Sequence, residues 1–182
     1  PDYLFIPVGN AGNITAYWKG FVEYYRAGKA SHTPKMMGFQ AEGAAPIVLG
    51  KVVKRPKTIA TAIRIGNPAS WQKAVAARNE SGGIIDCVTD DEIMNAYRLM
   101  TVKEGIFGEP ASAASLAGLI KLARKKDFSS KRVVCVVTGT GLKDPGVPAR
   151  YARAPIELPA DLAAVEEVLK FPTSAIPNRA RR

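Results

Sequence analysis

The sequence has few cysteines and no long apolar run. Its two cysteines, Cys87 and Cys135, lie in short apolar runs typical of strands. We expect buried, reduced thiols, which suit a cytoplasmic protein, although a disulfide or a reactive thiol stays open. The apolar runs are far below the roughly 20 residues of a membrane helix, and residues 1–8 lack the features of a signal peptide. A soluble protein without a membrane partner is therefore expected.

Acidic residues are the minority, and the formal net charge is +10. The basic excess is spread along the chain, with local clusters at 51–57 and 124–126. Neither cluster alternates with the aromatic residues on which nucleic-acid bases would stack. We expect solvated loops or helix ends there, and no nucleic-acid partner. A positive surface would also attract anionic metabolites.

Short apolar runs alternate with amphipathic segments, which predicts an α/β fold with an open, mostly parallel sheet and helices on both faces. After the first strand, apolar residues recur at helical spacing, which predicts a helix. Asn67 and Pro68 predict the start of another helix. Thr89 and Glu92 predict a capping box at the start of a third. The expected strands are 3–8, 35–40, 83–88 and 131–137, and the expected helices are 14–28, 44–49, 67–81, 89–104, 110–123 and 162–169. We expect one main domain at 1–145, then a carboxy-terminal helix and a basic tail at 146–182.

Two glycine-rich loops follow predicted strands, where parallel sheets bind ligands. Gly9 to Asn13 places small residues so that backbone N–H groups can approach an anion at a helix start. The loop lacks the Gly-Lys-Ser/Thr of a Walker loop and the third glycine of a dinucleotide fingerprint. On spacing alone, a simple turn is the more frequent outcome. Thr138 to Gly141 offers a hydroxyl that can hydrogen-bond a heteroaromatic nitrogen, although a turn-capping threonine is again more frequent.

Five segments in this order resemble blocks of threonine synthase, within the pyridoxal-phosphate fold shared with tryptophan synthase β subunits. They are VGNAGNITAYWKGF, MMGFQAEGAAPIVLG, ATAIRIGNPASW, GEPASAASLAGL and TGTGLKDP, which occur in that order within residues 1–145. Later, 155–169 resembles the family's final helix, whereas 146–153 matches nothing expected and Thr140 replaces a bulkier residue. The resemblance implies a pyridoxal 5'-phosphate enzyme of the tryptophan synthase β-like fold.

The resemblance also implies site residues. The backbone at Gly9, Asn10, Ala11, Gly12 and Asn13 would hold the cofactor phosphate. Thr138 would lie beside the pyridine nitrogen, Ala62 and Ile63 near the ring, and Asn10 would also contact substrate. For Arg64 and Glu109, a site role and a structural ion pair both stay open. No metal site is expected.

By resemblance, the parent protein would convert O-phospho-L-homoserine and water to threonine and phosphate, as a carbon–oxygen lyase of threonine biosynthesis. The lysine that holds the cofactor lies before the phosphate loop in that family, in a Ser-x-Lys context. The Ser-x-Lys of this chain is 129–131, which follows the loop. We therefore expect the carboxy-terminal part of a longer protein, inactive alone and completed by an amino-terminal half, acting as a homodimer on a phosphorylated amino acid. A serine or threonine dehydratase, or a non-catalytic cofactor- or anion-binding fragment, are the alternatives.

Overall fold

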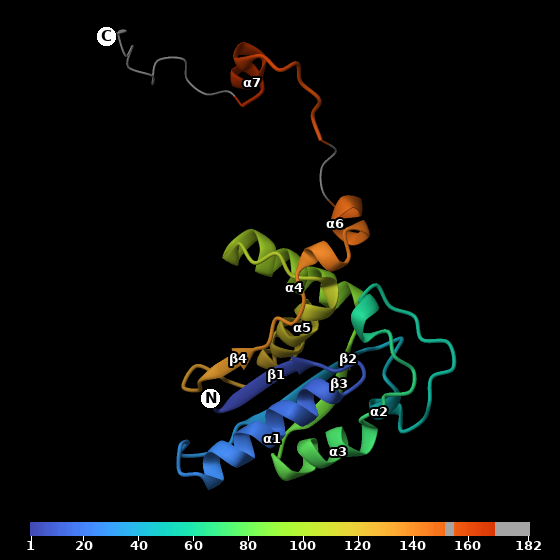
Figure 1. Cartoon of the computed structure of the whole chain (residues 1–182), viewed down its shortest axis with the longest axis vertical. Coiled ribbons are helices and arrows are strands. Elements are labelled where there is room, and N and C mark those ends of the chain that lie inside the picture. Colours follow the sequence, from blue (N-terminus) through green and yellow to red (C-terminus); the bar gives the residue numbers. More distant parts are fainter. Residues whose placement is uncertain (152–154, 170–182) are drawn as a thin grey trace. The chain divides into compact units, whose positions relative to one another are not determined.

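Four parallel strands form one sheet in a computed structural model that describes residues 1–151 and 155–169 (Figure 1). The sheet order is β3-β2-β1-β4, so the first strand of the chain is an inner strand. The strands are β1 (Tyr3–Pro7), β2 (Lys35–Ala41), β3 (Ile84–Val88) and β4 (Val133–Cys135). The chain divides into two compact units, 1–150 and 151–182, and the sheet belongs to the first.

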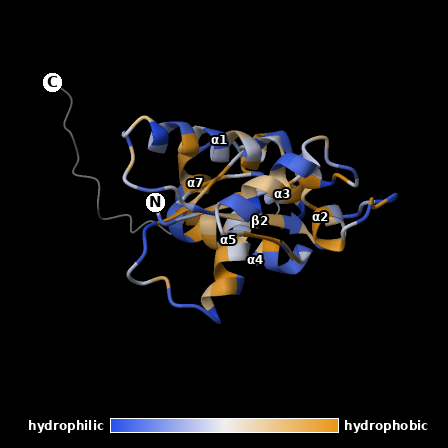
Figure 2. Cartoon of the chain, turned by 90° about the horizontal axis from the view of Figure 1, so that it is seen from below, coloured by the Kyte–Doolittle hydropathy of each residue, from blue (hydrophilic) through white to orange (hydrophobic). Residues whose placement is uncertain are grey.

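Helices cover both faces of this sheet, which confirms the predicted fold class. Alternate residues of β1 enter two separate cores, since successive side chains of a strand point to opposite faces. Leu4 and Ile6 pack with α1 (Gly12–Arg26) and α3 (Trp71–Glu80), whereas Phe5 packs with α4 (Asp90–Glu104) and α5 (Pro110–Ala123). Figure 2 shows α1 and α3 above β2, and α4 and α5 below it. The shorter elements are α2 (Pro46–Leu49), η1 (Thr61–Ile63), η2 (Gly141–Lys143) and α6 (Gly146–Tyr151).

Most predicted helix ends agree with the structure, and one is wrong. The Thr89 hydroxyl accepts from the Glu92 N–H while the Glu92 carboxylate accepts from the Thr89 N–H, so the capping box is confirmed. The predicted start at Asn67 is wrong, because α3 begins at Trp71 with Ser70 as its cap. The physical reason is a tether: the Asn10 side-chain oxygen accepts from Ala69 N, and its carbonyl accepts from Ser70 N.

The last strand is shorter than predicted. Val136 N still donates to Phe5 O at 2.8 Å, but the Val136 carbonyl accepts from the Ser115 hydroxyl of α5. The chain therefore leaves the sheet at Val136 and turns toward α5.

Both cysteines are free thiols, on β3 and β4 at opposite edges of the described sheet. Three strand spacings separate these edges by about 14 Å, well beyond the reach of a disulfide. Burial raises the pKa of the Cys135 thiol to about 11, so this thiol stays protonated at neutral pH. A disulfide between these two cysteines is therefore ruled out, and both side chains are half-buried rather than buried as predicted. That the thiols are reduced stays a prediction.

The residues around the predicted boundary at 145/146 belong to the first unit. Val147 of α6 is buried and belongs to the same core cluster as residues of α4 and α5. In the second unit, α7 (Leu162–Leu169) confirms the helix predicted there, and its Ala164 N donates to the Asp161 carboxylate. The basic tail predicted after this helix lies, from residue 170 onward, outside the described residues.

Candidate functional site

The sheet order brings the two glycine-rich loops together. The chain runs from β1 outward to β2 and β3, then crosses to β4 on the other side of β1. Connections therefore diverge from β1, and the carboxyl ends of β1 and β4 flank a topological switch point, where open α/β sheets bind ligands. Residues 8–13 leave β1 here, and residues 136–141 leave β4.

The loop after β1 is shaped by close backbone contacts. Ala11 caps α1 in the left-handed conformation with φ of 65°, which is costly for a residue other than glycine. An added Cβ at Gly9 would lie 3.0 Å from the Ile63 Cα and 3.1 Å from the Ala62 oxygen. An added Cβ at Gly12 would meet nothing within 4 Å. Gly9 thus lets the loop pack on η1, whereas Gly12 leaves open space over the backbone.

Two asparagines hold this loop in place. The Asn13 amide donates to the Pro7 carbonyl at 2.7 Å, and its oxygen accepts from Ile14 N. The Asn10 oxygen accepts from Ala69 N at 2.9 Å, which fixes the loop to the segment that precedes α3. The Asn10 side chain is exposed, and its NH₂ group is left to donate.

The loop after β4 is held by the start of α5. Glu109 N donates to Gly139 O at 2.9 Å, and Gly141 N donates to Phe107 O at 3.0 Å. The buried Ser112 hydroxyl lies 3.1 Å from the Thr138 hydroxyl and accepts from the N–H groups of Thr138 and Gly139. Thr61 of η1 donates to Asp144 at 2.8 Å, which ties η1 to the end of the same loop. Thr138 is therefore presented from a fixed backbone.

One cavity of about 330 Å³ gathers every residue for which the sequence implied a cofactor role. Glu109 also lines the cavity, whereas Arg64 does not and is exposed. Neither Arg64 nor Glu109 forms an ion pair within the described ranges, so a structural ion pair is not observed for either residue. The lining residues are Pro7, Gly9, Asn10, Ala11, Gly12, Asn13, Ala62, Ile63, Glu109, Ala111 and Thr138.

Two helix starts border this cavity. Gly12 and Asn13 begin α1, Pro110 and Ala111 begin α5, and neither helix has a side-chain cap at its start. Free N–H groups and the helix dipole favour an anion at such a position, and the open space at Gly12 lets an oxygen approach the backbone. The residues present therefore fit a phosphate-bearing group at the α1 loop and a ring nitrogen near Thr138.

Sequence reasoning missed Ser112 and Ala111. Ser112 belongs to the GEPASAASLAGL block, and a signal was present: a serine that faces the interior of an otherwise apolar helix has to find polar partners. Ala111 lines the cavity only because it lies in the first turn of α5, and an alanine gives no sequence signal for such a position.

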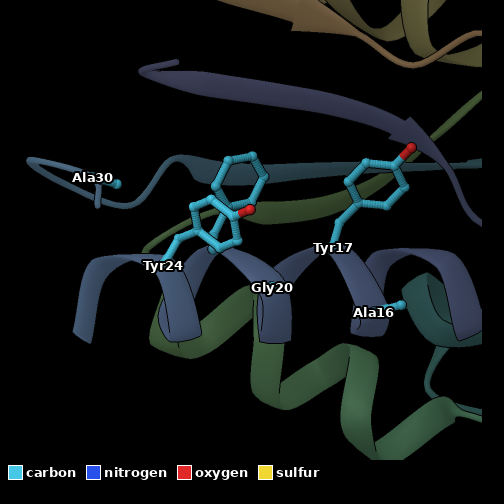
Figure 3. A pocket seen from close by; sticks show the side chains of 6 residues that line it. Ala16, Tyr17, Gly20, Tyr24 and Ala30 are labelled. Atoms are coloured by element: carbon cyan, nitrogen blue, oxygen red, sulfur yellow. The ribbon is translucent and has the colours of Figure 1, made fainter. Parts of the chain in front are cut away.

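A larger hollow of about 470 Å³ lies on α1, away from both loops. Tyr17 and Tyr24 rise from the same side of α1 with Gly20 between them, and Ala30 lies beyond the end of the helix (Figure 3). No charged side chain is among the described residues that line it. These residues have apolar surface to bury but no cationic group that would favour a phosphate.

Two further kinds of feature are absent from the part of the chain that the structure describes. No group of three or more His, Cys, Asp or Glu side chains there could hold a metal ion. None of the described helices is long and apolar enough to cross a membrane.

Fold and cavity together define a class: a doubly wound α/β protein with a ligand cavity at its switch point. The family model described as pyridoxal-phosphate dependent enzyme matches residues 1–139, which include both loops up to Gly139. The chain belongs to this family of pyridoxal-phosphate dependent enzymes.

Several curated relatives are named threonine synthase. The protein from Synechocystis sp. is 53% identical over 175 residues, covering 94% of this chain and 45% of the relative. The Halalkalibacterium halodurans protein is 62% identical over 146 residues, covering 80% of this chain and 41% of the relative. The Methanocaldococcus jannaschii protein is 49% identical over 179 residues, covering 93% and 44%. The chain thus spans less than half the length of these relatives.

Solved structures share the fold at low identity. A threonine deaminase from T.th. superposes with a TM-score of 0.61 at 19% identity, covering 77% of this chain and 50% of that one. Maize serine racemase superposes with a TM-score of 0.62 at 16% identity, covering 82% of this chain and 46% of the racemase. These enzymes confirm the predicted tryptophan synthase β-like fold.

Proposed function

We propose that this chain is the carboxy-terminal, cofactor-phosphate-binding part of a threonine synthase. The parent protein would convert O-phospho-L-homoserine and water to L-threonine and phosphate. The observation that carries the proposal is the single cavity in which all eight residues implied by the family resemblance meet. Identities of 49% to 62% to proteins named threonine synthase support the substrate.

Each part of the cavity has a proposed role. The backbone N–H groups of the Gly9 to Asn13 loop bind the cofactor phosphate, and the Thr138 hydroxyl contacts the ring nitrogen. Ala62 and Ile63 bound the space beside the ring, and the free NH₂ group of Asn10 binds the substrate. When bound, the cofactor supplies an electron sink for charge that develops on the substrate carbon atoms.

The chain's residues hold and orient the cofactor, but the proposal needs a lysine from elsewhere. In the family this lysine precedes the phosphate loop, and in this chain a β-strand begins at Tyr3. We propose that a preceding segment of the parent polypeptide provides the lysine, that the completed protein is a cytoplasmic homodimer, and that this chain alone is inactive.

Complementation tests the proposal. The chain is mixed with the amino-terminal half of the Synechocystis sp. threonine synthase and pyridoxal 5'-phosphate, and phosphate release from O-phospho-L-homoserine is measured. We expect phosphate release from the mixture, with a stronger imine absorbance band than either part gives alone, and no phosphate release from the separate parts. The control is the same half with its cofactor lysine replaced by alanine.

Two outcomes favour the alternatives. Binding of pyridoxal 5'-phosphate without product formation by a stable complex of the two parts would support a non-catalytic fragment. A dehydratase would release ammonia from serine or threonine, substrates that lack a phosphate leaving group, and would leave O-phospho-L-homoserine unchanged.

A further inference from the structure

Ser112 is fully buried in the first turn of α5 and has four polar neighbours. Its hydroxyl oxygen accepts from Thr138 N at 3.1 Å and from Gly139 N at 2.8 Å. The same oxygen lies 2.9 Å from the Gly139 carbonyl and 3.1 Å from the Thr138 hydroxyl oxygen. All four neighbours belong to the loop after β4.

The donors and acceptors around Ser112 fix the direction of the hydroxyl contact. A serine hydroxyl carries one proton and two acceptor lone pairs. The N–H groups of Thr138 and Gly139 occupy both lone pairs of Ser112. Ser112 therefore cannot accept from the Thr138 hydroxyl, and its single proton is shared between the Gly139 carbonyl and the Thr138 oxygen.

The Thr138 proton is consequently free for a ligand. No other described residue hydrogen-bonds the Thr138 hydroxyl, and Thr138 is exposed where it lines the cavity. We infer that Ser112 is a positioning residue that makes the Thr138 hydroxyl a hydrogen-bond donor directed into the cavity. The inference rests on the proposed function, in which the acceptor is the cofactor's ring nitrogen.

The surroundings of Ser112 keep this arrangement in place. Its own N–H donates to the Glu109 carbonyl at 3.0 Å, and its carbonyl accepts from the Ser115 hydroxyl at 3.0 Å. Because threonine hydroxyls do not ionise near neutral pH, the donor forms a hydrogen bond without transferring its proton, and the ring nitrogen stays neutral.

A ligand pair isolates the contribution of the ring nitrogen. Pyridoxine 5'-phosphate and its 1-deaza analogue, in which CH replaces the ring nitrogen, both lack the aldehyde that would react with surface lysines. Their dissociation constants are measured by calorimetry on the full chain. We expect the nitrogen-containing ligand to bind about 3- to 10-fold more tightly, as one hydrogen bond contributes.

The variants separate positioning from packing. In Ser112→Ala, the preference for the ring nitrogen should fall to near one, as it should in Thr138→Val, and the double variant should show no further loss. Ser115→Ala is the matched control: Ser115 is equally buried on the same helix and bonds the Ser112 and Val136 carbonyls, but not Thr138. It should keep the wild-type preference.

Failures of the two proposals are distinguishable. If Ser112→Ala binds both ligands with the wild-type preference, the positioning role is overturned and the proposed function stands. If the wild-type chain binds neither ligand, the proposed function is overturned and the inference with it. Should Ser112→Ala fail to fold, Ser112→Cys replaces the hydroxyl with a slightly larger thiol that is only a weak donor and acceptor, and it should show the same loss of preference.

Discussion

Helices α1 and α5 begin at the same cavity but differ in how far the protein encloses them. α1 has 15 residues, of which only Ile14 is buried, whereas α5 has 14 residues, of which eight are buried. α5 lies between the sheet and α4, and its small residues allow close contact. α1 packs on the sheet through one side and leaves Tyr24 at 59% exposed.

The difference shows that the two helices serve the cavity in different ways. α5 holds the backbone of Thr138 and Gly139 through Ser112 and the end of β4 through Ser115, and eight of its residues are buried. α1 is fixed mainly at its start, by Asn13 and the tether at Asn10. Substitutions along α5 should therefore alter stability, whereas on α1 only those near its start should alter binding.

The largest effect is expected at Gly118 of α5. An added Cβ there would collide with the ring of Phe39, which is fully buried and stacked on Phe5. Gly118→Ala should lower the free energy of unfolding by about 1–3 kcal/mol, the usual cost of overpacking a core. Urea unfolding followed by tryptophan fluorescence measures the change, and an unchanged midpoint would show that α5 is not tightly enclosed.

The next effect is expected at Gly12, the first residue of α1. The added methyl of Gly12→Ala meets no protein atom but enters the cavity beside the backbone N–H groups. The affinity for pyridoxine 5'-phosphate should fall about tenfold or more, because a hydrogen bond to a charged group is lost. Stability should not decrease, and calorimetry and urea unfolding together check both parts. Equal affinity in the variant would place the phosphate elsewhere.

A gain in stability is expected at Gly20, which lies farther along α1. An added Cβ meets nothing within 4 Å, and glycine inside a helix is unfavourable relative to alanine. Gly20→Ala should raise the free energy of unfolding by about 0.5–1 kcal/mol and leave ligand affinity unchanged. A loss of stability instead would mean that the hollow around Gly20 is closed in solution.

The smallest effect is pH-dependent and concerns the far end of α5. Lys121 pairs with Asp86 at 3.0 Å; burial opposes its charge, but the Asp86 hydrogen bond and charge raise the Lys121 pKa above 10.5. A raised pKa stabilises the fold fully below 10.5, and the contribution disappears as pH rises through the folded pKa. For this partly exposed pair we expect about 0.2–1 kcal/mol. The stability difference between wild type and Lys121→Met should stay constant up to about pH 10 and shrink as pH rises above 10.5, and a difference that stays constant there would contradict the assignment.

The elements of the fold could be predicted because their signals are local. Alternation and helical spacing place the strands and the long helices, and Thr89 with Glu92 fixes one helix start within a single turn. The start of α3 could not be predicted in this way, since it depends on hydrogen bonds that Ala69 and Ser70 donate to Asn10, which lies far earlier in the chain. The end of β4 likewise depends on a hydroxyl of α5.

The cavity was predictable only with the resemblance. The glycine spacing at Gly9 to Asn13 does not distinguish an anion loop from a turn, and nothing local links it to Thr138. Their proximity follows from the sheet order, which a single sequence does not state. Ser112 was missed because its importance lies in four partners on another segment.

The sheet order also has a consequence for the time course of folding. Tyr3 pairs with Lys35 on one side and with Val133 on the other, so β1 acquires its two neighbours at very different chain separations. The longer closure costs about 1.2 kcal/mol more entropy, equivalent to two doublings of loop length. Folding is slowed by such distant pairings. During synthesis, the Gly9 loop emerges long before Thr138, and we expect the ligand cavity to be among the last features to form.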